Sequence, residues 1–287
     1  MGSLEASGRT TVAGHQRVSN ATQEAVILAV ETSSRIGSAA LAVGPDLLQE
    51  LRFSAPMQHS VEILPTISEL LKRHGHVPAD LDQIHIAIGP GSFTGLRIAV
   101  TMAKAMHLAN AVRIVTVDSL DVVAANVTDR PAIPAEGQDE NHGTFVPDQI
   151  AALFDAKRGQ FYASVYQRRA QNDRPDTDST ESGYRIPGPY NGLWQKIVPD
   201  CLMTAGEIIE RFAGTDPLGL LGDGLFYHRD KFNTNGLVIL PERYWSPRAA
   251  NVHRLGYQKA LAGRFDDPLA LTPFYLRGPQ VTVRKNL

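Results

Sequence analysis

Several signatures are scarce or missing in this 287-residue sequence, and each absence argues against a class of protein. The single cysteine, Cys201, can form neither an internal disulfide nor the cysteine pair of a zinc site. No run of about 18 apolar residues occurs, which argues against a membrane-spanning helix. The first two dozen residues also lack the apolar segment of a signal peptide. We therefore expect a soluble protein in the reducing cytoplasm.

An excess of charge of either sign is also lacking, because the net charge is only -2. Proteins that bind nucleic acid directly usually show a basic surface, so any link to RNA is expected to run through partner proteins. Hydrophobic residues make up 43% of the chain, which is enough for a large core and too many for a disordered protein. The length suffices for one large domain or two ordinary ones.

The motifs of two common enzyme classes are missing as well. No Gly-x-Ser-x-Gly nucleophile motif occurs. The glycine-rich run Gly89–Arg97 is not followed by the Lys-Ser/Thr pair of a P-loop. This run leaves a predicted strand and enters a predicted helix with Thr94 as the expected N-cap. Its backbone N–H groups could hold an anion, but we favour a tight strand-to-helix connection.

The first part of the chain shows the pattern of an α/β lobe. Polar residues 1–24 are interpreted as a flexible extension, and residues 25–127 as the lobe. Apolar periodicity and turn residues predict the order of its elements. They are strands at 26–30, 38–43 and 47–53, a helix at 59–74, a strand at 84–88, a helix at 95–109, a strand at 113–117 and a helix to about 127.

A second unit, 148–287, is expected after a linker at 128–147 rich in Pro, Asp and Gly. Its predicted elements are strands at 150–155 and 161–166, a polar insertion at 168–185, a helix at 204–213, a strand at 218–221 and a final helix at 247–263. A strand, an acidic residue, a turn and a strand thus occur twice, at Glu31 and at Asp155. This duplication is typical of two ribonuclease-H-like lobes of the acetate/sugar kinase–Hsp70–actin type, with mixed sheets flanked by helices. Two similar hairpins can also occur in any α/β protein.

The two helices predicted in the first lobe carry surplus apolar surface. Around the 95–109 helix the apolar arc covers more than half of the circumference, whereas a surface helix needs a stripe of about 100°. One explanation is that the 59–74 helix buries the surplus within the lobe. We favour a subunit interface built from both helices. The residues expected at this partner interface are Val61, Leu64, Leu71, Ile98, Ala99, Met102, Ala103 and Met106.

Several segments resemble the bacterial TsaB family, and they follow one another in the family's order. They are Leu28–Ser34, His59–Ser60 with Ile63–Pro65, Gly89–Arg97, Asp155–Tyr162 and Pro273–Arg277. The run Gly-Pro-Gly-Ser-Phe-Thr-Gly-Leu-Arg is highly specific, and the match spans roughly residues 25–125, 150–166 and the C-terminal tail. Glu31 stands where the family more often has Asp, so the carboxylate is kept.

The resemblance implies a role in making threonylcarbamoyladenosine in tRNA. TsaB proteins form a heterodimer with a paralogous transferase, TsaD, through the two helices that match 59–74 and 95–109, and an ATPase, TsaE, joins the complex. TsaC makes the threonylcarbamoyl-adenylate, and TsaD transfers its threonylcarbamoyl group to the adenosine next to the anticodon. The resemblance further implies a reduced second lobe. The low net charge favours contact with tRNA only through the complex, and the surplus apolar surface predicts a homodimer through the same helices when the partner is absent.

The sequence gives little support for catalysis by this chain itself. The transferase carries a His-x-x-x-His metal pair, and Ser119 and Val123 occupy the corresponding positions here. We expect no catalytic residue, no metal and no cofactor, and leave open weak ATP or ADP binding at the partner interface. The alternative is a stand-alone ATP-dependent phosphotransferase or acyltransferase. The residues expected at a vestigial nucleotide or anion site are Glu31, Thr32, Ser33, Gly91, Ser92, Asp155, Gly222 and Gly224.

Overall fold

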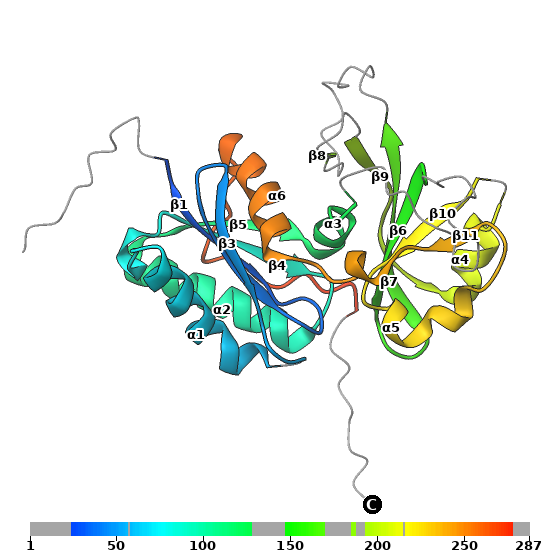
Figure 1. Ribbon diagram of the computed structural model, residues 1–287, viewed down its shortest axis with the longest axis horizontal. Helices are drawn as coiled ribbons and strands as arrows, with labels where there is room; N and C mark the ends of the chain where they lie inside the picture. The colour runs from blue at the N-terminus through cyan, green and yellow to red at the C-terminus, as the bar shows by residue number, and fades with distance from the viewer. Residues whose placement is uncertain are drawn as a thin grey trace, which may run out of the picture.

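The computed structural model describes residues 24–56, 58–127, 147–169, 185–187, 193–214 and 216–277. These residues form two lobes that lie side by side (Figure 1). The predicted extension 1–24, linker 128–147 and insertion 168–185 lie largely outside the described residues. None of the helices in the described part of the chain is long and apolar enough to cross a membrane.

The first lobe is a five-stranded mixed sheet with helices on both faces. Its strand order is β3-β2-β1-β4-β5, where β1 pairs antiparallel with β2 and parallel with β4. Every residue of β1 is buried, because helices cover both faces of the sheet. The elements are β1 (Val26–Glu31), β2 (Ser38–Val43), β3 (Asp46–Arg52), α1 (His59–Arg73), η1 (Pro78–Asp80), β4 (Gln83–Gly89), α2 (Phe93–Asn110), β5 (Arg113–Asp118) and α3 (Ser119–Ala124).

The second lobe repeats this arrangement, so the predicted duplication is confirmed. Its central strand again pairs antiparallel with the next strand in the chain and parallel with a later one, in the order β11-β10-β6-β7-β9-β8. Its strands are β6 (Gln149–Asp155), β7 (Gln160–Arg169), β8 (Arg185–Pro187), β9 (Leu193–Thr204), β10 (Leu218–Leu221) and β11 (Leu237–Ile239). Its helices are α4 (Ala205–Phe212), α5 (Leu225–His228), η2 (Arg229–Phe232) and η3 (Glu242–Tyr244).

Strand β9 escapes the sequence prediction because its apolar residues do not alternate regularly with polar ones and Pro199 interrupts it. The proline lies at an irregularity in the ladder, since Cys201 pairs with Ala163 and Val198 pairs with Val165. Two residues of β9, Pro199 and Asp200, therefore stand opposite one residue of β7, which is the geometry of a β-bulge. A bulge accommodates proline and redirects the neighbouring side chains.

The last helix, α6 (Ala249–Leu261), corrects the predicted division into lobes. The 247–263 helix was expected to complete the second lobe, but it packs on β1, β2, β4 and β5 of the first lobe. Figure 1 shows it on the face of the sheet opposite α1 and α2. The Ala249 amide donates to Ser38 Oγ (2.9 Å), and Nε2 of His253 donates to the Gly44 carbonyl (2.9 Å). The chain thus returns to the first lobe after forming the second.

Apolar side chains gather in two clusters. One lies between the first sheet and helices α1 and α2, and the other fills the second lobe and continues to Ala29, Ala40 and Ala87 of the first sheet. Helix α3 follows the last strand of the first lobe, yet its Leu120 and Val123 belong to the core of the second lobe. The lobes are therefore joined by buried contacts around α3, in addition to the return of α6.

Two stacked histidines lie between α6 and the sheet of the first lobe. The rings of His85 and His253 are 6.2 Å apart, and Gly256 lies so close to His85 that a Cβ there would collide with the ring. Burial, with a smaller contribution from His253, lowers the pKa of His85 to about 3 from its ordinary 6.5. The folded protein therefore keeps His85 neutral, and acid favours the unfolded state.

We expect this pair to limit stability in acid. Between pH 6.5 and 3, His85 is protonated in the unfolded chain and neutral in the folded chain. The free energy of unfolding should fall across this window, by roughly 5 kcal/mol at its lower end. In urea denaturation, the gap between wild type and His85→Gln should narrow as the pH falls from 6.5. A gap that stays constant with pH would show that His85 is not the group responsible.

Candidate functional site

The glycine-rich turn between β4 and α2 packs directly on the turn after β1. A Cβ on Gly91 or Gly95 would collide with the carbonyl oxygen of Ser33 or Thr32, respectively. The Ser92 amide donates to the Ser33 carbonyl (2.7 Å). The N-cap of α2 is Ser92 rather than the expected Thr94, because Ser92 Oγ accepts from the Gly95 amide (3.3 Å). The turn therefore uses its glycines for close packing, as we favoured from the sequence.

Glu31, the last residue of β1, caps the turn that follows this strand and is completely buried. Its carboxyl group accepts hydrogen bonds from the Ser33 amide (2.6 Å) and the Ser33 hydroxyl, while the Thr32 hydroxyl donates to the Gly95 carbonyl (2.8 Å). Burial raises the pKa of Glu31 to about 7, although the hydrogen bonds from Ser33 oppose this. The Glu31 carboxyl group thus accepts its hydrogen bonds from within the protein.

Replacing Glu31 with Gln should remove a pH dependence on the alkaline side. Because the folded pKa of about 7 exceeds the usual 4.5, protonated Glu31 stabilises the fold fully below pH 4.5. This stabilisation is lost as the pH rises through 7, at a cost of roughly 3 kcal/mol. Urea denaturation at pH 5 and pH 8 should show the difference in wild type and a smaller one in Glu31→Gln. Equal differences would mean that Glu31 ionises normally.

The equivalent turn of the second lobe is built in the same way. Asp155 Oδ1 accepts from the Lys157 amide (2.8 Å), and Oδ2 forms an ion pair with Lys157 Nζ (2.7 Å). Although partial burial opposes ionisation, these contacts lower the pKa of Asp155. A Cβ on Gly222 would collide with the backbone of Leu153, and one on Gly224 would press on Leu153 and Phe161. Both glycines therefore serve packing.

A cavity of about 380 Å³ lies between the two turns. Of the expected nucleotide-site residues, it brings together Ser33, Gly91, Ser92 and Asp155. The other expected residues lie behind its wall, where they cap or pack: Glu31, Thr32, Gly222 and Gly224. Residues of the wall that the sequence interpretation missed include Arg35 and Tyr227.

The charges around this cavity are largely balanced. The Arg35 guanidinium stacks on Phe226 (5.3 Å) and Tyr227 (4.8 Å), and Lys157 is paired with Asp155. Burial raises the pKa of Asp223 to about 7, against the effect of hydrogen bonds from the Arg35 and Asp155 backbone. Within the described residues, no three His, Cys, Asp or Glu side chains are grouped as metal ligands would be. The cavity therefore lies where a nucleotide cleft is expected in this fold, but the charged side chains named above make their contacts within the protein.

The positions of the transferase's metal ligands have other roles here. Ser119 Oγ accepts a hydrogen bond from the Gly89 amide (3.1 Å), and Val123 is buried in the core of the second lobe. Neither side chain can ligate iron or zinc from such a position.

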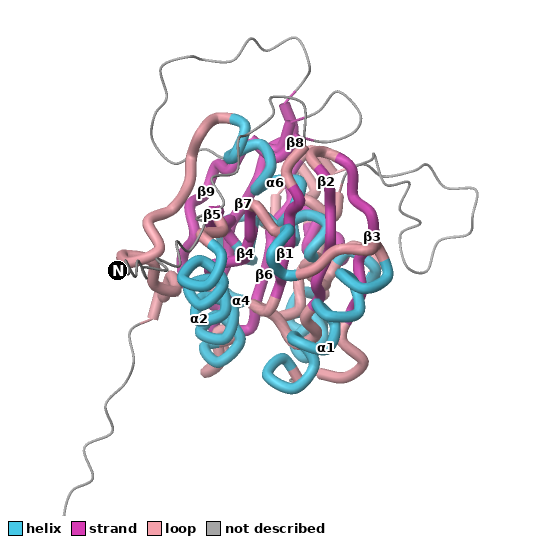
Figure 2. Tube along the Cα trace, turned by 90° about the vertical axis from the view of Figure 1, so that its left-hand side faces the viewer, coloured by secondary structure: helices cyan, strands magenta, loops and turns pink. Residues whose placement is uncertain are grey.

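A second hollow, which we call the helix groove, runs between α1 and α2 and measures about 770 Å³. Its apolar wall includes the predicted interface residues Leu64, Ile98, Met102 and Met106. Figure 2 shows the two helices side by side on the same face of the molecule. Leu64 is 61% exposed, and the neighbouring Val61 on α1 is 66% exposed. The sequence interpretation missed Phe93, Ala105 and Ala109, which extend the wall.

Three predicted interface residues are not available to a partner. Leu71, Ala99 and Ala103 are buried in the core of the first lobe. They lie on the sides of α1 and α2 that face the sheet, so part of the broad apolar arc is covered by the lobe itself. The surplus that remains is the helix groove.

Two ribonuclease-H-like lobes around a cleft define the class of actin-like ATPase folds. A TsaB protein of Bacillus subtilis, named as a tRNA threonylcarbamoyladenosine biosynthesis protein, is 30% identical over 256 residues, covering 88% of this chain and 93% of the relative. The chain therefore belongs to the TsaB family.

Other comparisons agree with this assignment. A TsaB protein of Escherichia coli is 28% identical over 253 residues, covering 88% of this chain and 94% of the relative. The family model of TsaD, tRNA N6-adenosine threonylcarbamoyltransferase, matches residues 54–182. A crystal structure from Pseudomonas aeruginosa, described as similar to peptidase YEAZ, superposes with a TM-score of 0.63 at 20% identity, over 88% of this chain and 100% of that one. This last likeness supports the fold.

Proposed function

We propose that this chain is the non-catalytic scaffold subunit of the complex that forms threonylcarbamoyladenosine in tRNA. In this proposal it dimerises with a TsaD-type transferase through the helix groove and supports transfer of the threonylcarbamoyl group to the adenosine next to the anticodon. Its membership of the TsaB family supports a role in this pathway.

The observation that carries the proposal is the exposure of large apolar side chains along α1. Val61 and Leu64 are both more than half exposed, and Leu64 borders a groove whose other wall is formed by Ile98, Met102 and Met106. An apolar patch of this kind on a folded protein marks an interaction site. The small residues Ala105 and Ala109 would allow a partner helix to approach α2 closely.

The helix groove and the low net charge of the chain also bear on its other partners. The helix groove is expected to pair with a second copy of the chain when the transferase is absent, because either partner removes its apolar side chains from water. A TsaE-type ATPase is proposed to join the larger complex. With a net charge of -2, the chain is proposed to meet tRNA only through that complex.

The lack of intrinsic activity is supported by the roles of the strand-end carboxyl groups. Glu31 and Asp155 stand where kinases of this architecture hold metal and phosphate, but here both accept hydrogen bonds from the turns that follow them. Carboxylates at such positions stabilise turns. The alternative, a stand-alone phosphotransferase, requires Asp155 to be free for a ligand.

Reconstitution tests the proposal directly. The purified chain alone is expected to neither hydrolyse ATP nor modify tRNA. Added to the transferase, the ATPase and the enzyme that makes threonylcarbamoyl-adenylate, it should be required for modification, and Asp155→Asn should support modification as well as wild type. ATP turnover by the isolated chain that disappears in Asp155→Asn would favour the phosphotransferase instead.

A further inference from the structure

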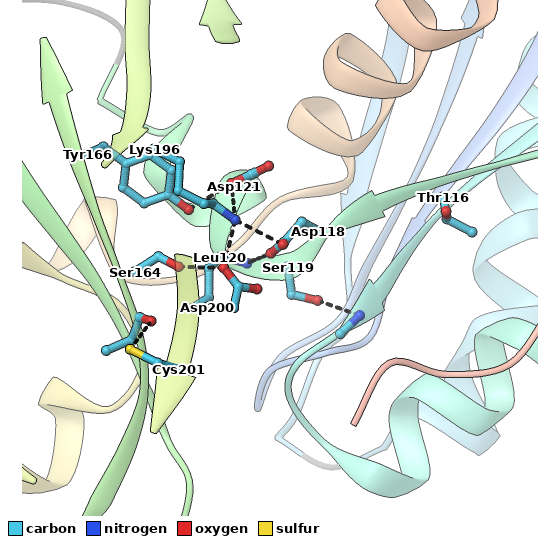
Figure 3. Close-up of polar contacts among 12 residues, drawn as sticks. Thr116, Asp118, Ser119, Leu120, Asp121, Ser164, Tyr166, Lys196, Asp200 and Cys201 are labelled. Carbon is cyan, nitrogen blue, oxygen red and sulfur yellow. Dashed lines mark hydrogen bonds and ion pairs between the residues drawn. The ribbon is translucent and has the colours of Figure 1, made fainter. Parts of the chain in front are cut away.

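A buried lysine meets three carboxyl groups where the lobes join. The side chain of Lys196 is only 5% exposed. Its ammonium nitrogen lies 2.9 Å from Asp118 Oδ2, 2.9 Å from Asp121 Oδ1 and 2.6 Å from Asp200 Oδ1. An ammonium group has three N–H donors, so three carboxyl acceptors match its capacity. Figure 3 shows Lys196 pointing into this group, which we call the junction cluster.

The junction cluster draws its members from both lobes. Asp118 ends β5 of the first lobe and caps α3, where its Oδ1 accepts from the Leu120 amide (2.9 Å), and Asp121 lies in α3 itself. Lys196 and Asp200 both come from β9 of the second lobe. The ladder between β7 and β9 is irregular on both sides of Val198, and bulges bend a strand, so Lys196 and Asp200 meet although they are four positions apart. The ion pairs therefore cross from one lobe to the other.

Neighbouring side chains hold the carboxyl groups in place. The Tyr166 hydroxyl donates to Asp121 Oδ1 (2.7 Å), and the Ser164 hydroxyl donates to Asp200 Oδ1. Both donors come from β7, next to β9 in the same sheet. Burial, and next the charge of Asp121, raises the pKa of Asp118 well above its ordinary value, and burial also raises the pKa of Asp121. The Lys196 ammonium therefore faces carboxyl groups that the protein holds in fixed positions.

Other contacts between distant segments surround the junction cluster. Trp194 Nε1 donates to the carbonyl of Val127, which follows α3 (2.8 Å), so β9 is held beside the end of the first lobe. On the opposite side of the cleft, Arg277 in the C-terminal tail donates to the Ala156 carbonyl (2.8 Å). The same tail is held to the first lobe, since the Phe274 amide donates to the Ile88 carbonyl (2.9 Å). The lobes are thus tied at separate places.

We propose that Asp118, Asp121 and Asp200 form a cation site at the lobe junction, that the chain fills it with its own Lys196 ammonium, and that the filled site fixes the two lobes in one arrangement. The carboxyl groups would repel one another when ionised, and the ammonium between them offsets this repulsion. Because the cation is tethered to β9, it is never released, and the lobes cannot part without leaving buried charges unpaired. The cavity of about 380 Å³ between them then keeps its size.

The junction cluster lies within one chain, so its effect on the lobes does not depend on the proposed partner. It describes a two-lobed protein whose cleft does not open and close with a nucleotide. Such a chain would present its helix groove on a body of constant shape.

The test measures the distance between the lobes. In a Cys201→Ser background, Glu69→Cys on α1 and Glu210→Cys on α4 provide exposed sites for spin labels, one in each lobe. The labelled protein, diluted with unlabelled protein, is expected to show one narrow distance that does not change with ATP and Mg²⁺. In a Lys196→Ala version the distribution should widen at least twofold, and added ethylammonium should narrow it again.

The spin-label distances in the Lys196→Ala protein support or overturn the proposal. A folded Lys196→Ala protein with the same narrow distance as its parent would overturn the proposal, because the ammonium would then not hold the lobes. If Lys196→Ala fails to fold, the test uses the labelled protein with Lys196 intact. A distance between its two labels that shifts with ATP and Mg²⁺ overturns the proposal. A distance that stays narrow and unchanged supports it.

Discussion

Met102→Glu on α2 and Leu64→Glu on α1 are each expected to weaken binding to a TsaD-type transferase by at least about 100-fold. Both side chains line the helix groove, and a carboxylate there would be removed from water without a charged partner. A loss of about 3 kcal/mol corresponds to that factor in the dissociation constant. Analytical ultracentrifugation of the two proteins, mixed over a range of concentrations, measures the change.

A matched control separates loss of the interface from general damage. Glu69→Lys also changes a charge on α1, but Glu69 lies outside the helix groove and forms an exposed pair with Arg73. This variant should assemble like wild type, and all three variants should retain the wild-type melting temperature. Ala103→Glu is unsuitable because Ala103 is fully buried and the change would disrupt the core. Wild-type affinity in Met102→Glu and Leu64→Glu would disprove the interface.

Lys196→Met is expected to lower the free energy of unfolding by about 3 to 5 kcal/mol, because it leaves buried carboxylates without their counter-charge. Asp121 and Asp200 would lose the ammonium that lies within 3 Å of each. Methionine has a similar length, so the loss reflects charge more than packing. Urea denaturation followed by circular dichroism gives the value.

Asp118→Asn serves as the comparison, since burial raises the pKa of Asp118, and the asparagine side-chain oxygen can still cap α3. Its free energy of unfolding should lie within about 1 kcal/mol of wild type. If Asp118→Asn costs as much as Lys196→Met, the damage comes from the lost volume and hydrogen bonds of any member, and the charge of Lys196 has no special role.

The parts of the fold that the sequence predicts are those with local signals. The strand, carboxylate and turn at Glu31 and again at Asp155 revealed the duplicated lobe, and both turns have the same hydrogen-bonding pattern. Helix α6 was found but assigned to the wrong lobe, because its apolar pattern does not say which sheet it covers. Strand β9 was missed because Pro199 is unfavourable within a strand and its apolar residues do not alternate regularly.

The candidate site shows the same limit. Angular position around α2 identified a broad apolar arc, but it could not separate Ala99 and Ala103, which face the sheet, from Met102 and Met106, which border the helix groove. That division depends on where the sheet lies. The junction cluster had no detectable signal, since Lys196 and Asp118 are 78 positions apart and meet only through the pairing of the lobes.

Oxidative footprinting of the methionines tests the helix groove as a subunit interface most directly. Met102 and Met106 line this groove, whereas Met203 is buried in the second lobe and serves as an internal reference. In the mixture with the transferase, oxidation of Met102 and Met106 by hydrogen peroxide should slow at least about tenfold, while Met203 is unchanged. If the two proteins co-sediment while Met102 and Met106 oxidise at the rate of the free chain, the partner binds elsewhere and the account is wrong.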